Sequence, residues 1–264
     1  MADPVPRSKS AMLHGLKVTA SVLTSTAALW RGTDCFAPAR EPPAELLHLY
    51  EFEGCPYCRM VRQTLTELDL DVLILPCPKG GTRFRPTALE LGGKAQFPLL
   101  EDPNTGTRMY ESRDIAAYLA QTYGGHARAN AEPLRSLFLL GSMGASALRP
   151  LSGMRARPSK APEQPLELYS FESSPYSRLV RERLCELELP YILRNTGKAA
   201  WTDMGPPAVR DRLLKAPADS GRNRAALLAR TGRVQVPYLI DPNTNTEMFE
   251  SADIIDYLER QYAA

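Results

Sequence analysis

The sequence has little net charge, few cysteines and no long hydrophobic run. It contains 32 Lys or Arg and 30 Asp or Glu among 264 residues, so its formal net charge of +2 gives no indication of a nucleic-acid-binding surface. Five cysteines are too few, and odd in number, for a disulfide framework, and a reducing intracellular compartment is expected. No apolar run reaches the roughly 18 residues that a membrane span needs. No transmembrane segment is therefore expected.

The N-terminal 44 residues are biased toward positive charge. Between Pro4 and Thr33 the sequence contains basic residues, abundant Ser, Thr and Ala, and no acidic residue. This composition is typical of an organellar transit segment, but it also fits a mature basic helix, which we favour. Residues 1–44 are therefore expected to form a basic helical extension.

The rest of the chain contains an internal repeat. Residues 47–62, LHLYEFEGCPYCRMVR, match residues 166–181, LELYSFESSPYSRLVR, at ten of 16 positions with an offset of 119. Further on, QFPLLEDPNT and ESRDI recur as QVPYLIDPNT and ESADI with an offset of 139, so the second copy contains 20 additional residues, around 201–223. A repeat of this length indicates two whole domains.

Each copy has the same order of strand and helix signals. In the first copy, β-forming and apolar patterns predict strands at 47–52, 71–75, 98–101 and 108–110. Helical spacing predicts helices at 59–68, 87–91 and 112–123. The initial strand–helix–strand unit predicts parallel pairing, and the turn at 102–106 makes the last two strands a hairpin. The expected organisation is an extension (1–44), a first domain (45–124), a proline-rich linker with a short apolar helix (125–164) and a second domain (165–264).

This order of elements, with Cys55-Pro56-Tyr57-Cys58 opening the first helix, resembles glutaredoxin. The Glu-Ser pair that opens the last helix is similar to the N-terminal domain of glutathione transferases. The whole arrangement resembles tandem thioredoxin-fold proteins of cyanobacteria, algae and plant plastids, which implies an α/β fold of two thioredoxin-like domains and a plastid stromal location. A full transferase continues with a large all-helical domain. This chain has a second thioredoxin-like domain instead, which puts transferase activity toward bulky hydrophobic substrates in doubt.

The C-P-Y-C motif contains the residues expected to do chemistry. Cys55 lies immediately before a helix, where the backbone N–H groups favour a thiolate, and Arg59 and Arg62 are expected to add positive potential. Cys58, one turn later, is expected to be the resolving thiol; the alternative is an inert pair of core cysteines. A zinc site would need a second close Cys or His pair, which the sequence lacks. Many glutaredoxins have a Lys where this sequence has Phe52, so the thiolate loses one possible cationic neighbour.

The resemblance also implies which residues bind glutathione. Pro98 matches the cis-proline of thioredoxin-like folds, which exposes the backbone of Phe97 to the cysteinyl part of glutathione. Glu111 and Ser112 match the pair that holds the γ-glutamyl group, since a helix N-terminus with a hydroxyl suits a carboxylate. The alternatives are a trans proline at a strand edge and plain helix capping. The expected binding set is Tyr57, Gln96, Phe97, Pro98, Glu111 and Ser112.

A basic loop and a third cysteine follow the second strand. Lys79, Arg83 and Arg85 are either acceptors of the glycyl carboxylate or a solvated loop. Cys77 is either a third redox thiol or, as we favour, a packed apolar residue.

The second copy keeps the binding residues without the dithiol. Serine replaces both cysteines at Ser174 and Ser177, and a hydroxyl neither ionises near neutral pH nor forms a disulfide. Retained glutathione binding and a purely structural remnant are both open, and we favour binding. The possible second site consists of Ser174, Gln235, Val236, Pro237, Glu250 and Ser251.

The leading hypothesis is a glutathione-dependent thiol–disulfide oxidoreductase. Cys55 attacks a disulfide of a protein or of a glutathionylated protein, and Cys58 or glutathione resolves the product. One alternative is a non-catalytic glutathione-binding or scaffold protein. Another is an iron–sulfur carrier that uses Cys55 and glutathione as ligands across a dimer, although no metal ligand set is assigned. Glutathione is the expected co-substrate or ligand.

Overall fold

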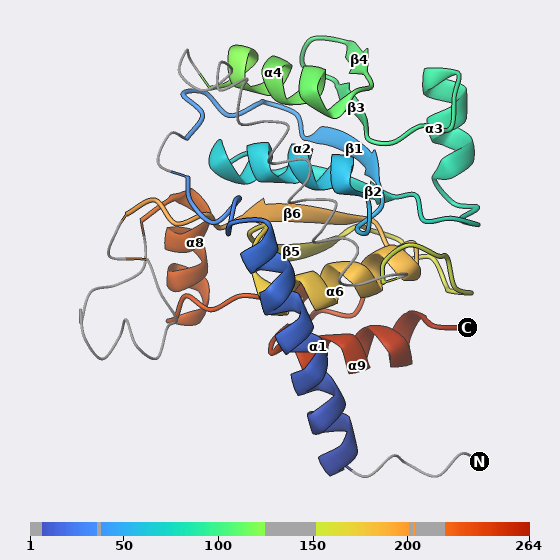
Figure 1. The fold of residues 1–264 in the computed structure, drawn as a ribbon, viewed down its shortest axis with the longest axis vertical. Helices are drawn as coiled ribbons and strands as arrows, with labels where there is room; N and C mark the ends of the chain where they lie inside the picture. Colours follow the sequence, from blue (N-terminus) through green and yellow to red (C-terminus); the bar gives the residue numbers. More distant parts are fainter. Residues whose placement is uncertain (1–6, 36–37, 125–151, 201–202, 204–219) are drawn as a thin grey trace.

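The computed structural model describes residues 7–35, 38–124, 152–200, 203 and 220–264 (Figure 1). It has the expected α/β fold with one domain for each repeat. The extension and first repeat form α1 (Arg7–Ala27), β1 (Leu47–Glu51), α2 (Pro56–Glu67), β2 (Val72–Pro76), α3 (Arg85–Gly92), β3 (Leu99–Asp102), β4 (Thr107–Met109) and α4 (Ser112–Thr122). The second repeat forms β5 (Leu166–Ser170), α6 (Pro175–Glu186), β6 (Tyr191–Asn195), α8 (Arg222–Thr231), β7 (Tyr238–Asp241), β8 (Thr246–Phe249) and α9 (Ser251–Tyr262). The linker helix expected between 125 and 164 and most of the insertion lie outside the described residues.

Both domains have thioredoxin-like strand pairing. In the first, β1 pairs in parallel with β2 and antiparallel with β3, and β4 completes a hairpin with β3. The second domain repeats this arrangement with β5, β6, β7 and β8. The helices that follow β1 and β5 each begin at a proline, Pro56 and Pro175, whose fixed φ and missing N–H suit the first helical position.

The two domains join edge to edge into one eight-stranded sheet. Its order is β4-β3-β1-β2-β6-β5-β7-β8, with β2 and β6 antiparallel at the centre. Leu73 pairs with Ile192, the residue that occupies the same position in the second repeat. A local two-fold axis therefore passes between these residues, as it would between the subunits of a symmetric dimer.

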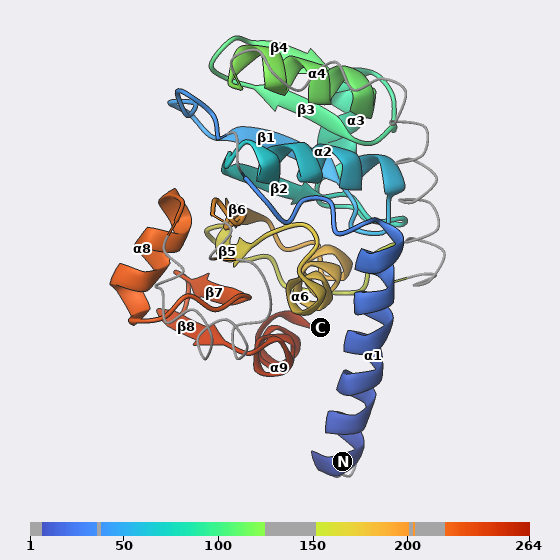
Figure 2. The ribbon, with the colours of Figure 1, turned by 60° about the vertical axis from the view of Figure 1, so that its left-hand side comes forward.

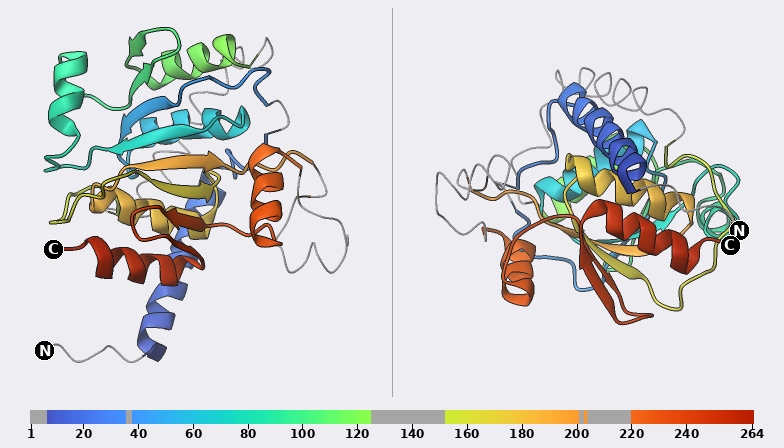
Figure 3. Two further views of the ribbon diagram at one scale, coloured as in Figure 1. Left: turned by 180° about the vertical axis from the view of Figure 1, so that it is seen from behind. Right: turned by 90° about the horizontal axis from the view of Figure 1, so that it is seen from below.

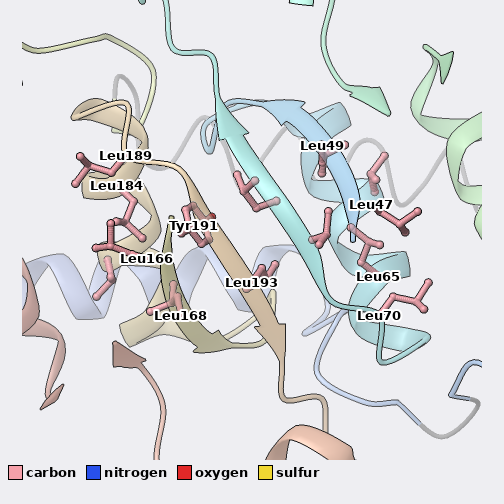
Figure 4. Packing of buried hydrophobic residues seen from close by; sticks show 14 of the residues in the cluster. Leu47, Leu49, Leu65, Leu70, Leu166, Leu168, Leu184, Leu189, Tyr191 and Leu193 are labelled. Carbon is pink, nitrogen blue, oxygen red and sulfur yellow. The ribbon is translucent and has the colours of Figure 1, made fainter. Parts of the chain in front are cut away.

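One hydrophobic core extends across this junction. Alternate side chains of β1 point to one face of the sheet, so Leu47 and Leu49 pack with Leu65 of α2. On the other side of the junction, Leu168 and Tyr191 belong to the same buried cluster (Figure 4). Because the strands and the core are both continuous, the two domains form one folded unit.

The N-terminal extension is helical, as predicted, and packs on the second domain. Helix α1 lies along α6, and Figures 2 and 3 show it beside α6 and α9. Its hydroxyl face is turned inward, with Ser21 and Ser25 buried, whereas Met12, Leu16 and Leu23 are exposed. Among the described helices, none has the length and hydropathy that crossing a membrane requires.

Candidate active site

Cys55 occupies the position that the motif predicts, at the N-cap of α2. Its backbone is extended, with φ −76° and ψ 122°, and its Sγ accepts a hydrogen bond from the backbone N–H of Cys58 at 3.3 Å. Both thiols are reduced, and the exposed fraction is 3% for Cys55 and 0% for Cys58. The helix N-terminus therefore directs its unpaired N–H groups at the Cys55 sulfur.

The surroundings of the two thiols push their pKa values apart. A hydrogen bond from the Cys58 thiol is the main contact that lowers the pKa of Cys55; the backbone N–H groups of Tyr57 and Cys58 and the charge of Arg62 act in the same direction, against the effect of burial. Burial raises the pKa of Cys58 well above its usual range, and its hydrogen bond to Cys55 adds to this. Of the two thiols, Cys55 therefore ionises more readily, and Cys58 keeps its proton to higher pH.

The loop before β3 contains the predicted cis-proline. The peptide bond between Phe97 and Pro98 is cis, which confirms the prediction for Pro98. The Phe97 ring lies edge-on to the ring of Phe52, with 6.3 Å between centroids, and the Arg85 guanidinium stacks over it at 4.8 Å. Phe52 thus replaces the lysine of many glutaredoxins with an aromatic contact to the cis-proline loop.

The Glu-Ser pair and Gln96 come together at the start of α4. Gln96 Nε2 donates to Glu111 Oε1 at 2.6 Å, and Ser112, which is buried, places its Oγ 4.0 Å from the Sδ of Met60 on α2. Glu111 is the N-cap residue, but its side chain makes no capping hydrogen bond, and its φ of 66° is unusual for a residue other than glycine. Such a conformation persists where the surrounding structure requires it, and the Glu111 side chain is bound by Gln96 and does not cap the helix.

Of the three basic residues after β2, the two arginines bind carbonyl oxygens of the chain itself. Arg83 is bound by the second domain, since it donates to the Leu187 carbonyl at 3.3 Å and to Ser159. Arg85 donates to the carbonyl of Cys77 at 2.8 Å. Lys79 alone is exposed. Cys77 is fully buried, and burial raises the pKa of its thiol, as expected of a packed residue.

The second domain reproduces the geometry of the site without its thiols. Ser174 Oγ and Ser177 Oγ are 2.8 Å apart, and the Val236–Pro237 peptide bond is also cis. Gln235 Nε2 donates to Glu250 Oε1 at 2.6 Å, as in the first domain.

Helix α1 contacts both ends of this second site. His14 Nε2 lies 3.0 Å from Ser251 Oγ, the hydroxyl assigned to the γ-glutamyl group. Ser21 Oγ donates to the Pro175 carbonyl at 2.9 Å, directly after Ser174. The chain's own extension therefore supplies a hydrogen-bond partner for Ser251 and for the backbone next to Ser174.

Sequence reasoning missed a buried ionic cluster between the domains. Arg62 Nε donates to Glu172 Oε2 at 2.8 Å, and Arg181 Nε donates to Glu53 Oε2 at 3.1 Å. These two contacts are equivalent in the repeat, so each domain's arginine pairs with the other domain's glutamate. Arg62 also contacts Glu51, which Ser170 replaces in the second copy.

Arg59 and Arg62 were expected to add positive potential near Cys55. Both are buried in the domain interface, and Arg59 lies 3.7 Å from Glu172. The positive charge of Arg62 lowers the pKa of Cys55, in line with that expectation. The recurrence of the Glu and Arg positions in both repeats was the signal available in the sequence. The sequence does not show how the two domains pair, and it is this pairing that brings the glutamates and arginines into one cluster.

Comparison with known proteins finds the same domain family twice in this chain. The family described as glutathione S-transferase, N-terminal domain, matches residues 49–127 and again residues 168–264. Among solved structures, a Bombyx mori glutathione transferase, BmGSTD1, is 30% identical over 33% of this chain and 39% of its own, with a TM-score of 0.28. A Nilaparvata lugens delta-class glutathione transferase is 26% identical over 34% of this chain and 43% of its own, with a TM-score of 0.27.

The chain thus spans about two fifths of the length of these two transferases. Leishmania TDR1, a trimeric glutathione transferase, is 12% identical over 82% of this chain and 67% of its own, with a TM-score of 0.26. No curated protein matches the chain.

Among the residues that the structure describes, no group of three or more His, Cys, Asp or Glu side chains is arranged to hold a metal ion.

Proposed function

Because the chain belongs to the family with the glutathione S-transferase N-terminal domain, we propose that it is a glutathione-dependent thiol–disulfide oxidoreductase. The observation that carries this proposal is the pair of thiols at the start of α2. Both thiols are buried; the Cys55 sulfur accepts a hydrogen bond from the Cys58 N–H at the helix start, and Cys58 lies one turn later. A transferase needs one activated group at this position, but an oxidoreductase uses an attacking and a resolving thiol.

The reaction begins with the Cys55 thiolate. It attacks the glutathione sulfur of a glutathionylated protein, so that a Cys55–glutathione disulfide forms and the protein thiolate leaves. In one resolution, Cys58 gives up its proton and attacks the Cys55 sulfur, which releases glutathione and leaves a Cys55–Cys58 disulfide. In the other, a second glutathione attacks the bound glutathione sulfur, which releases oxidised glutathione and restores the Cys55 thiolate.

In this proposal glutathione binds to residues of α2, the cis-proline loop and the start of α4. Ser112 and Glu111 would hold its γ-glutamyl end, and the backbone of Phe97 would pair with its cysteinyl part. This placement is supported by the hydrogen bond between Gln96 and Glu111, which joins the loop to the helix start. Tyr57, about half exposed, lies at the rim where a protein substrate would approach.

The test is a glutathione-coupled reduction assay with a small mixed disulfide. Cys55→Ser is expected to abolish turnover, whereas Cys58→Ser retains part of it, because glutathione replaces the resolving thiol but nothing replaces the nucleophile. Cys35→Ser is the matched control, since Cys35 is a buried free cysteine outside the C-P-Y-C motif. Equal turnover of Cys55→Ser and the parent protein would contradict the proposal.

A further inference from the structure

The residue two positions before the reactive cysteine is held by the second domain. Arg181 of α6 clamps the Glu53 carboxylate, with Nε 3.1 Å from Oε2 and Nη2 3.0 Å from Oε1. The backbone N–H of Glu53 donates to the Sγ of Cys185, also on α6, at 3.4 Å. Side chain and backbone of Glu53 are thus both fixed by the same second-domain helix.

The next residue is held by the segment that leads into the second domain. The Gly54 N–H donates to the Gly153 carbonyl at 3.4 Å. A Cβ on Gly54 would lie 2.5 Å from Cγ of the Met154 side chain and 3.1 Å from the Ser152 carbonyl oxygen, so the loop packs tightly against this segment. The backbone on the N-terminal side of Cys55 therefore rests on residues outside its own domain.

The cation beneath the thiols is placed in the same way. Arg62 lies one turn beyond Cys58 on α2 and is completely buried. Its Nε donates to Glu172 Oε2 at 2.8 Å, and Glu172 belongs to the loop after β5. A second-domain carboxylate thus helps to fix the arginine whose charge acts on Cys55.

We propose that the second domain, which has no dithiol, sets the reactivity of Cys55, with Arg181 and Glu172 acting as positioning residues. The inference rests on the proposed function only in taking Cys55 as the reactive thiol. Arg181 neutralises Glu53 beside the thiol and keeps its loop in place, and Glu172 keeps Arg62 under the helix start.

The physical reason is the balance of charge around the Cys55 loop. Negative charge near a thiol disfavours the thiolate, and positive charge favours it. In a buried cluster such effects are poorly screened by solvent. The charged and titratable groups that face the loop are Glu51 on β1, Cys58, Arg59 and Arg62 on α2, Glu172 after β5, and Arg178, Arg181 and Cys185 on α6.

The clamp is symmetric but its effect is not. Arg62 of the first domain holds Glu172 just as Arg181 of the second holds Glu53, while the Ser173 N–H donates to the Gly32 carbonyl of the N-terminal extension and the Gly54 N–H to the Gly153 carbonyl of the linker. In the second copy, however, the residue at the helix start is Ser174, which has no thiolate to stabilise. The second domain can therefore act on the chemistry of the first, but not the reverse.

The experiment compares two opposite changes of charge in the full-length chain. The pH dependence of Cys55 alkylation by iodoacetamide is followed by peptide mass spectrometry, and folding is checked by circular dichroism. In Arg181→Met the Glu53 carboxylate keeps only Arg62, at 3.1 Å, as an arginine partner, so its charge is less well compensated and the thiolate fraction below the midpoint is expected to fall by up to about tenfold. In Glu53→Gln that charge is removed, so the midpoint is expected to move to lower pH.

Arg183→Met is the matched control. Arg183 is also an arginine of α6, but it pairs with Glu186 and Glu259, away from the Cys55 loop. In this control the Cys55 thiolate fraction at a given pH is expected to stay within about twofold of the parent value. Arg181→Lys is expected to recover part of the parent alkylation profile.

Opposite shifts in Arg181→Met and Glu53→Gln would support the inference, because a general loss of packing would move both in one direction. Parallel shifts, or two folded variants with the parent profile, would overturn it. If Arg181→Met does not fold, a parent-like profile of Glu53→Gln is sufficient to overturn it. Alkylation needs no disulfide substrate, so a chain inactive in the reduction assay that shows opposite shifts would refute the proposed function alone.

Discussion

Replacing Glu172 with glutamine tests whether the ionic cluster holds the two domains together. The side chain is 1% exposed and contacts three arginines, Arg62, Arg181 and Arg59, at 2.8, 3.2 and 3.7 Å. Glutamine keeps the shape but removes the charge, which leaves the buried arginines short of one carboxylate. Removing one member of a buried ion pair is strongly destabilising, because it leaves an uncompensated buried charge.

The pKa of Glu172 gives the magnitude. Burial alone would raise the pKa, but the surrounding arginines lower it from 4.5 to about 2. At about 1.4 kcal/mol for each tenfold change in proton affinity, the charged form contributes about 3 kcal/mol to folding. This agrees with the roughly 3–5 kcal/mol that loss of one partner of a buried pair costs.

The sign of the pH dependence follows from the same comparison. The folded-state pKa lies below the unfolded value, so the contribution of Glu172 is present above pH 4.5 and is lost as the pH falls toward 2. Glu172→Gln is therefore expected to lower the stability at pH 7 by about 3 kcal/mol and to make little difference near pH 2.

The assay is urea unfolding followed by far-ultraviolet circular dichroism. A single transition is expected for parent and variant, because the core and the β2–β6 pair are common to both domains. Glu259→Gln is the control: its pairs with Arg157 and Arg183 are more exposed, so a loss of less than about 1 kcal/mol is expected. A loss below 1 kcal/mol for Glu172→Gln, or two separate transitions in the parent, would refute the reasoning.

Three further outcomes are expected at the two sites. Ser112→Ala should weaken glutathione binding by about 1–3 kcal/mol in calorimetric titration, the cost of a lost charge-assisted hydrogen bond; unchanged affinity would assign the residue to structure alone. The intact chain should bind one glutathione, because His14 already contacts Ser251; two equivalent sites by the same titration would contradict this. Cys55 should be alkylated at lower pH than the other four cysteines, because its pKa is lowered while theirs are raised; earlier modification of any other cysteine in the folded protein would contradict this.

The expectation of one bound glutathione differs from the sequence-based interpretation, which favoured binding at the second site as well. From the sequence, retained binding was favoured because Gln235, Glu250 and Ser251 persist. The structure shows that Ser251 already has a partner in α1. It also shows that a fragment from residue 165 onward would expose the β6 edge and half of the shared core, so the full chain is the sample to titrate.

Local chemistry was readable from the sequence because it depends on neighbouring residues. Period-two and period-three-to-four patterns located every strand and helix of the first domain to within about three residues, as is usual for such patterns. The expected helix at 59–68 begins earlier, at Pro56, because proline suits the first turn. The position of Cys55 at a helix start and the cis bond before Pro98 followed from motif and resemblance.

Only the tertiary structure decided how the two repeats meet. An edge strand such as β2 offers the same backbone groups to any partner strand, so its own residues do not specify that it pairs with β6. The roles of Arg62 and Arg181 depend on that pairing, because each finds its carboxylate across the junction. Likewise, α1 hides Ser21 and Ser25 and exposes leucines because the buried Arg178 needs hydroxyl and carbonyl acceptors. A sequence records the spacing of residues along a chain. The pairs Arg62–Glu172 and Arg181–Glu53 join residues more than a hundred positions apart, which only the folded chain brings together.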